Sequence, residues 1–373
     1  MMNKIHYFDY NASHPPLTKI IQEAWKEYSD EFYNPSGATR FSLGNQGKIE
    51  EARNFFAKET LFPSEGIVFS STGTEANFLL VAAIRQRFPD VKEFITSSFE
   101  HASFFSALEF FHFEPKILKT DFTGIISLTH LEEILKQSPL PTGIIYAGNE
   151  TGVIQPMEEV SHLVRSYGMP LVSDCMQAFG KIFINYHLLD GMTCSGHKIG
   201  AGPGSGLTTV REILIHSKWQ LPGGGNQENG HRAGSENLPS ILSFRKLSEY
   251  QIERLGSQIL PRIHMRTRIE SKLKELGCEI VAENSPRLPN TIFTILPIEE
   301  LDFLMMGLEE KSILISTGSS CKSRSREPAA SLLSMGYSKD EALRAIRISF
   351  GSLTTNAEID HLLISLETLL NQL

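Results

Sequence analysis

The chain has 373 residues, carries a net charge of −8 and is 41% hydrophobic, which suits two domains or one large domain with a smaller one. The acidic balance argues against a general nucleic-acid-binding protein. No stretch approaches the ~20 apolar residues of a membrane span, and the first residues, MMNKIHYFDYN, lack the apolar centre of a signal peptide, so we expect a cytoplasmic protein that binds neither nucleic acid nor membranes.

Short apolar runs alternate with helical patterns through the first two-thirds of the chain. The patterns predict strands at 66–70, 94–97, 143–147, 170–174 and 192–195, and helices at 74–84 and 156–167. Strand–helix alternation predicts an α/β fold with a mostly parallel sheet between helices. Active sites in such sheets lie at the carboxyl ends of the strands. We assign residues 16–255 to this large domain.

The pattern changes after residue 255. Helical segments rich in Arg and Lys are followed by a predicted strand in PNTIFTIL and by further helix. Thr355 and Glu358 have the spacing of a capping box, and an apolar stripe follows them. We therefore predict a smaller α+β domain at 256–373, with residues 1–15 as an N-terminal segment that packs with it.

The run Ser70-Ser71-Thr72-Gly73-Thr74-Glu75 lies between a predicted strand and the helix that follows. Backbone N–H groups at a helix start, together with small hydroxyl side chains, can form an anion cup, and Gly73 permits close backbone approach. An ordinary N-cap is the simpler alternative, because Ser and Thr are preferred there.

Two residues at neighbouring strand ends predict chemistry with a carbonyl cofactor. Lys198 ends the run Ser195-Gly196-His197-Lys198, where partial burial would lower its pKa and suit Schiff-base formation. Asp174 closes the preceding strand and could hold the proton on the ring nitrogen of pyridoxal phosphate. The alternatives are a surface lysine and an N-cap aspartate.

Cys321 lies in the polar run Ser-Ser-Cys-Lys-Ser-Arg-Ser-Arg, which predicts an exposed loop whose cations lower the pKa of the thiol. The other three cysteines have more apolar neighbours and are expected to be buried and inert. The chain has no CxxC pair, so we expect neither a metal site nor a disulfide framework. Arg347 alternates with isoleucines on a predicted strand and would grip a carboxylate, either of a substrate or of a structural ion pair.

In their order along the chain, the segments TGTEAN, FEHAS, NETGVIQP, DCMQ, SGHK, HRAGSEN, STGSSC and IRISFG resemble the cysteine desulfurases of the class V aminotransferase superfamily. The resemblance extends from Tyr7 to Gly351. It implies a fold-type I enzyme with a seven-stranded, mostly parallel sheet and pyridoxal 5′-phosphate as cofactor. The implied reaction converts L-cysteine to L-alanine and leaves the sulfur as a persulfide on Cys321, for delivery to a sulfur-acceptor protein.

The resemblance also implies a role for each matching residue. Lys198 would bind the cofactor and remove the α-proton, and His101 would stack on the ring and assist proton transfers. Further cofactor contacts are implied for Gly73, Thr74, Asn149, Asp174, Gln177, Ser195, His197 and Ser235. Ser235 takes the place of a threonine that reaches the phosphate of the partner subunit, which implies a homodimer. Substrate contacts are implied for Asn34, Asn149 and Arg347.

Two alternatives stay open. A selenocysteine lyase, or another class V lyase or aminotransferase, would use the same lysine and arginine, although a transaminase has no use for the loop thiol of Cys321. A catalytically silent scaffold protein would be expected to lack Lys198, Asp174 or Cys321, and all three are present.

Overall fold

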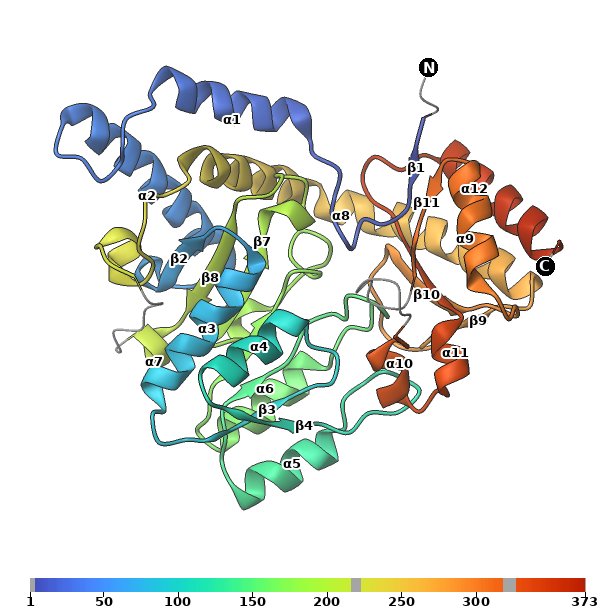
Figure 1. The fold of residues 1–373 in the computed structure, drawn as a ribbon. Helices are drawn as coiled ribbons and strands as arrows, with labels where there is room; N and C mark the ends of the chain where they lie inside the picture. Colours follow the sequence, from blue (N-terminus) through green and yellow to red (C-terminus); the bar gives the residue numbers. More distant parts are fainter. Residues whose placement is uncertain (1–3, 216–222, 318–326, 373) are drawn as a thin grey trace.

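The computed structural model describes residues 4–215, 223–317 and 327–372. Its largest sheet has seven strands in the described residues, which confirms the α/β prediction (Figure 1). Their order is β2 (Ile67–Ser70), β8 (Gly206–Val210), β7 (Gly191–Ser195), β6 (Leu171–Asp174), β5 (Thr142–Gly143), β3 (Glu93–Thr96) and β4 (Glu114–Ile117). The strand β8 runs antiparallel to both of its neighbours, and the other pairs are parallel.

The strand predicted at 143–147 is shorter than expected, since β5 ends at Gly143. The backbone still follows β6 beyond that point: the N–H of Ile144 donates to the carbonyl of Val172 at 3.1 Å, and that of Tyr146 donates to the carbonyl of Asp174 at 3.0 Å. This extension carries the chain to the carboxyl edge of the sheet.

Helices cover both faces of the sheet. Helices α3 (Gly73–Arg87) and α4 (Ala102–Phe110) enclose one apolar core with the sheet, which includes Leu80, Phe94 and Phe104. The opposite core includes Phe56 and Val160 and is formed by α2 (Arg40–Thr60), α5 (Leu128–Gln137), α6 (Met157–Ser166) and the start of α8 (Leu238–Glu275). Helix α1 (Thr18–Asp30) packs on α8, and α7 (Glu212–Ile215) follows β8.

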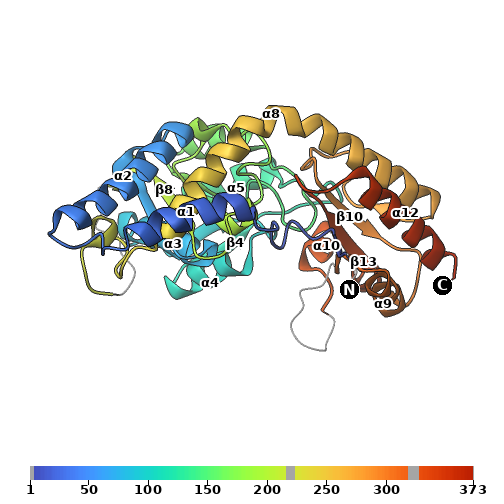
Figure 2. The same ribbon diagram turned by 90° about the horizontal axis from the view of Figure 1, so that it is seen from above.

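The long helix α8 runs from the predicted large domain into the predicted small one, as Figure 2 shows from above. Its first half contacts α1 and α2, and its second half contacts β9 and α12. The predicted boundary at residue 255 falls inside this helix, and the division into domains stays a prediction.

In the described residues, the predicted small domain is built on a four-stranded sheet of β12 (Ser316–Thr317), β13 (Ala345–Ser349), β10 (Thr291–Ile295) and β9 (Glu279–Ile280). It is accompanied by α9 (Leu301–Glu310), α10 (Ala330–Met335), α11 (Lys339–Leu343) and α12 (Asn356–Leu370). The capping box is confirmed: the Thr355 hydroxyl accepts from the N–H of Glu358, whose side chain accepts from the N–H of Thr355.

The N-terminal segment joins this domain before it turns back to the large one. Strand β1 (His6–Tyr7) pairs in parallel with β11 (Ile313–Leu314), and Phe8 is buried in the small-domain core. A separate apolar cluster, which includes Phe99 and Ile145 from the large domain and Phe293 and Leu332 from the small one, seals the two domains together. Across the described ranges, no helix combines the length and apolarity that crossing a bilayer demands.

Candidate active site

A cavity of about 470 Å³ opens where the carboxyl ends of β6 and β7 meet the start of α3, the N-terminal segment and β13. Its walls bring together predicted site residues from distant parts of the chain: Gly73, Thr74, His101, Asn149, Asp174, Gln177, His197, Lys198 and Arg347. Asn11, Ala12, Thr72, Ser103, Ile145 and Met176 complete the lining. The volume falls in the range that small-molecule sites occupy.

Lys198 ends the short 3₁₀ helix η3 (Gly196–Lys198), which directly follows β7. Its ammonium donates to the backbone carbonyls of Asn11 at 2.7 Å and Ala12 at 2.9 Å. Burial, together with the charge of Arg347, lowers the pKa of Lys198 to about 8, although Asp174 and Asp9 act to raise it. The amine is therefore available as a nucleophile or base much closer to neutral pH than that of a surface lysine.

Asp174 lies at the end of β6 and is only 2% exposed. One carboxylate oxygen accepts from the N–H of Met176 at 2.9 Å, and the other accepts from the side-chain amide of Asn77 at 3.0 Å. Asn77 is oriented in turn by the hydroxyl of Thr193, which donates to its oxygen at 2.7 Å. Sequence reasoning did not single out Asn77, because a buried asparagine inside the TGTEAN helix shows its partner only in three dimensions.

His101 precedes α4 and is held in one tautomer. The N–H of Ser103 donates to its Nδ1 at 3.1 Å, so the proton of the neutral ring is on Nε2. Burial lowers the pKa of His101, and Lys198 lowers it further while Asp174 raises it. A neutral imidazole beside Lys198 and Asp174 suits both ring stacking and proton transfer.

The start of α3 forms one end of the cavity. Thr72 is the N-cap, since its hydroxyl accepts from the N–H of Glu75 at 3.1 Å, so the alternative of an ordinary cap is correct for this residue. Gly73 and Thr74 follow it along the cavity wall. A Cβ on Gly73 would lie 2.4 Å from the end of the Met176 side chain, which would have to move to make room for it. Free N–H groups at such a helix start favour an anion.

Next to this helix start, burial and the charge of Lys198 lower the pKa of His197 to about 4. The Nδ1 of His197 is 2.7 Å from the hydroxyl of Ser195, which donates to the carbonyl of Ser205 at 3.1 Å. Ser195 is 1% exposed and lies behind His197, outside the cavity lining.

Arg347 extends from β13 into the cavity, where it also forms an ion pair. One terminal nitrogen donates to Asp9 at 2.7 Å and the other donates to the backbone carbonyl of Asn149 at 2.9 Å. Its Nε is buried and has no hydrogen-bond partner among the described residues. The structural ion pair is therefore present in the folded chain, and the grip on a substrate carboxylate stays a prediction.

Two predicted residues lie outside the cavity lining. Asn34 is exposed between α1 and α2, where its side chain accepts from the N–H of Ser36 at 2.9 Å. Ser235 is exposed on the loop before α8. Gln227 donates to the hydroxyl of Ser36 at 3.2 Å and so links the Asn34 segment to the loop that carries Ser235.

Cys321 lies outside the described residues, so the structure says nothing of its place. The other cysteines, Cys175, Cys194 and Cys278, are buried as predicted. Burial raises the pKa of all three thiols, to about 11 for Cys278, which keeps them protonated and unreactive.

A model of the family described as aminotransferase class-V matches residues 6–362. The chain belongs to the aminotransferase class-V family. Relatives of this chain include a cysteine desulfurase of Trichormus azollae, which is 32% identical over 96% of this chain and 90% of the relative. The cysteine desulfurase IscS of Dictyoglomus turgidum is 30% identical over 100% of this chain and 96% of the relative.

Solved structures agree with this family assignment. The class-V chain is similar to a protein described as NifS-like, with 28% identity, a TM-score of 0.91 and coverage of 99% of this chain and 100% of the other. A NifS-like protein from Rickettsia africae is 29% identical, with a TM-score of 0.87 and the same coverage. A third structure, described as SspA in complex with cysteine, is 28% identical with a TM-score of 0.78 and covers 92% of this chain and 98% of the other.

Proposed function

We propose that this class-V protein is a pyridoxal-phosphate-dependent cysteine desulfurase that converts L-cysteine to L-alanine. The observation that carries the proposal is the buried amine of Lys198, with its pKa lowered to about 8, in one cavity with Asp174 and Arg347. The names of the relatives support the same activity. So does the similarity to SspA, whose structure is described as a complex with cysteine.

The cavity suits pyridoxal phosphate in the kinds of donor that it offers. Lys198 would hold the aldehyde carbon, Asp174 the pyridine nitrogen, and the start of α3 with Thr74 and His197 the phosphate, with Ser195 behind His197. His101 would stack on the ring, and Asn149 and Gln177 would contact its hydroxyl region. When bound, the cofactor supplies an electron sink for the negative charge that develops on the substrate α-carbon.

The residues of the chain would divide the remaining chemistry. Arg347, which lines the cavity, would hold the substrate carboxylate. Lys198, as a free amine, would remove the α-proton. The Cys321 thiolate would then attack the substrate sulfur: a sulfur–sulfur bond forms, the carbon–sulfur bond breaks, and its electron pair stays on the carbon that becomes the methyl group of alanine. The persulfide would pass to an acceptor protein.

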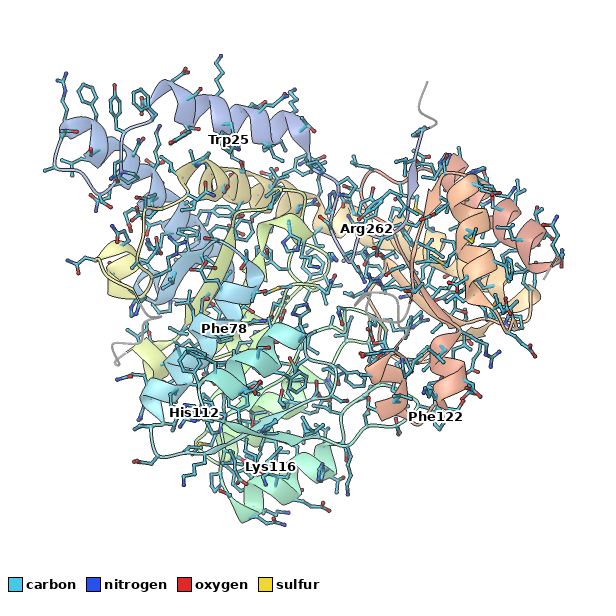
Figure 3. The ribbon with its side chains drawn as sticks, viewed as in Figure 1. Trp25, Phe78, His112, Lys116, Phe122 and Arg262 are labelled. Carbon is cyan, nitrogen blue, oxygen red and sulfur yellow. The ribbon has the colours of Figure 1, made fainter. Side chains whose placement is uncertain are left out.

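Placement of the two outlying residues supports a homodimer. The segment near Asn34 carries a cluster of exposed apolar side chains: Trp25, Phe32, Phe41 and Leu43 are 50%, 66%, 48% and 56% exposed. This cluster lies on α1, on α2 and on the loop between them, and Trp25 is labelled on α1 in Figure 3. An apolar face of this kind favours an interface. A second copy would cover it and bring Ser235 and Asn34 to the partner's cavity.

The decisive experiment is a visible spectrum of the purified protein before and after L-cysteine is added, with alanine and sulfide assayed in the same tube under reductant. We expect a yellow protein, a shifted band and equal amounts of alanine and sulfide. Lys198→Ala should lose the band of the bound cofactor, whereas Cys321→Ser should keep the band and release no sulfide.

Other outcomes would each change the proposal in a defined way. A yellow protein that forms alanine only from selenocysteine would make it a selenocysteine lyase. A colourless protein that gains no band with added cofactor would contradict the enzyme assignment and favour a silent scaffold. Normal sulfide release by Cys321→Ser would move the acceptor thiol to another cysteine.

A further inference from the structure

A second lysine is buried beside the candidate active site. Lys181 follows β6 in a tight turn that Gly180 makes possible with a φ of 71°, and the residue is only 5% exposed. Among the described residues, no carboxylate forms an ion pair with it; its hydrogen-bond partners are two side-chain amides. A lysine so deeply buried without an acidic partner is unusual and costly, which calls for a specific role.

The amine of Lys181 closes a ring of hydrogen bonds under the cavity. It donates to the amide oxygen of Gln177 at 2.5 Å and to the side-chain oxygen of Asn11 at 3.2 Å. The amide nitrogen of Gln177 donates to the backbone carbonyl of Asn11 at 2.8 Å, and that carbonyl also accepts from Lys198 at 2.7 Å. Lys181 thus fixes which end of the Gln177 amide faces Asn11.

Asn11 connects this ring of hydrogen bonds to the small domain. Its N–H donates to the hydroxyl of Ser349 at 3.0 Å, and its side-chain nitrogen donates to the hydroxyl of Thr291 at 2.9 Å. Ser349 is on β13, the same strand as Arg347, and Thr291 is on the neighbouring β10. The placement of Gln177 and Lys198 is therefore linked to the strand that carries Arg347.

The surrounding charges favour the neutral form of this amine. Burial lowers the pKa of Lys181, and the charges of Lys198, Arg262 and Arg347 lower it further. Arg262 is itself buried on α8, where Figure 3 labels it close to the junction of the two domains. A neutral amine has two N–H donors, which matches the two acceptors that Gln177 and Asn11 offer.

We propose that Lys181 is a positioning residue. It acts through Gln177 and Asn11 to keep the cofactor-binding side of the cavity in a fixed position relative to Lys198 and β13. This inference rests on the proposed function, because it assigns Gln177 to the cofactor. Lys181 itself is outside the cavity lining. Its effect on cofactor binding must therefore pass through the residues that it holds.

A double-mutant cycle tests this path with cofactor affinity as its readout. Apoprotein of the wild type, Lys181→Met, Gln177→Leu and the double variant is titrated with pyridoxal phosphate, and its melting temperature is measured in parallel. We expect each single change to weaken binding about tenfold, the size of one lost hydrogen bond to a ligand. Because both act along one path, the double variant should bind within about threefold of the weaker single variant.

The matched control is Lys272→Met, which removes a lysine that pairs with Glu367 at 2.7 Å far from the cavity; it should leave cofactor affinity unchanged. A double variant weakened about a hundredfold, as independent effects predict, would overturn the proposal. So would unchanged affinity in Lys181→Met despite a lower melting temperature, which is the result of a merely structural lysine.

If Lys181→Met does not fold, Lys181→Gln takes its place in the same cycle, because it keeps a donor in the buried site. The same two results, coupled or independent, then decide. Wild-type apoprotein that does not bind pyridoxal phosphate would contradict the proposed function itself, so the two failures are distinguishable.

Discussion

At Lys198, burial and the two nearby carboxylates of Asp174 and Asp9 act in opposite directions on the pKa. Burial favours the neutral amine, while the carbonyls of Asn11 and Ala12 hold the donor in place at 2.7 and 2.9 Å. Burial and the charge of Arg347 outweigh Asp174 and Asp9, which gives a pKa of about 8, below the ordinary value of 10.5. A lysine in this range is largely charged at neutral pH yet exchanges its proton readily, which suits a residue that must act as nucleophile and then as base.

This balance predicts how the reactivity of Lys198 depends on pH in the apoprotein. Since a lowered lysine pKa means that the free amine predominates above that value, acetylation should increase as pH rises and level off just above a midpoint near 8. Competitive labelling with acetic anhydride, followed by mass spectrometry of the Lys198 peptide, measures this midpoint.

Lys116 is the internal control, because its exposed amine has a raised pKa, owing first to its hydrogen bond with Glu93. Its labelling should keep rising through the whole range in the same samples. A Lys198 midpoint that coincided with that of Lys116 would contradict the burial argument.

At the scale of elements, the start of α3 combines helix capping with a place on the cavity wall. Thr72 caps α3 by accepting from the N–H of Glu75, and Thr355 caps α12 by accepting from the N–H of Glu358. The two threonines make the same local interaction, but only Thr72 lines the cavity. They therefore form a matched pair that separates stability from function.

We predict that Thr72→Ala and Thr355→Ala each lower the free energy of unfolding by about 1 kcal/mol, the usual cost of a lost N-cap. Only Thr72→Ala should also weaken binding of pyridoxal phosphate, because the first N–H groups of α3 would lose their fixed direction toward the phosphate. Urea unfolding and a cofactor titration give the two values. Equal loss of cofactor affinity in both variants would show that α3 has no special part in anion binding.

At the scale of the whole molecule, the position of the Ser235 loop predicts that both subunits of a dimer contribute residues to each active site. Ser235 lies on an exposed loop outside its own cavity lining, and Lys198 lies inside. If Ser235 serves the partner's cavity, a dimer needs one intact residue of each kind on opposite chains. Complementation between two inactive variants tests this requirement.

We predict that Lys198→Ala and Ser235→Glu are each inactive, the second because a carboxylate would repel the cofactor phosphate. After subunit exchange in an equal mixture, heterodimers should each have one complete site and restore about a quarter of wild-type desulfurase activity. Size-exclusion chromatography of both variants controls for dimer formation. If mixed dimers form but no activity returns, Ser235 either acts in its own subunit or has no part in the reaction.

Local signals account for what the sequence by itself determined. The alternation of strands and helices, the capping box at Thr355, and the positions of Asp174 and Lys198 at strand ends all depend on neighbours within a few residues, so periodicity and short motifs reveal them. Because parallel strands end at a common edge, the same local signals also predicted that those two side chains meet.

Only the tertiary structure decided which polar residues complete the site. Asn11 contacts Gln177, Thr291 and Ser349, Asn77 holds Asp174, and Lys181 is buried through a turn, all by contacts between residues far apart in the chain. It also placed Asn34 and Ser235 on loops away from the cavity of their own chain. The physical reason is that a side-chain hydrogen bond requires both partners in space, and a one-dimensional pattern records only one of them at a time.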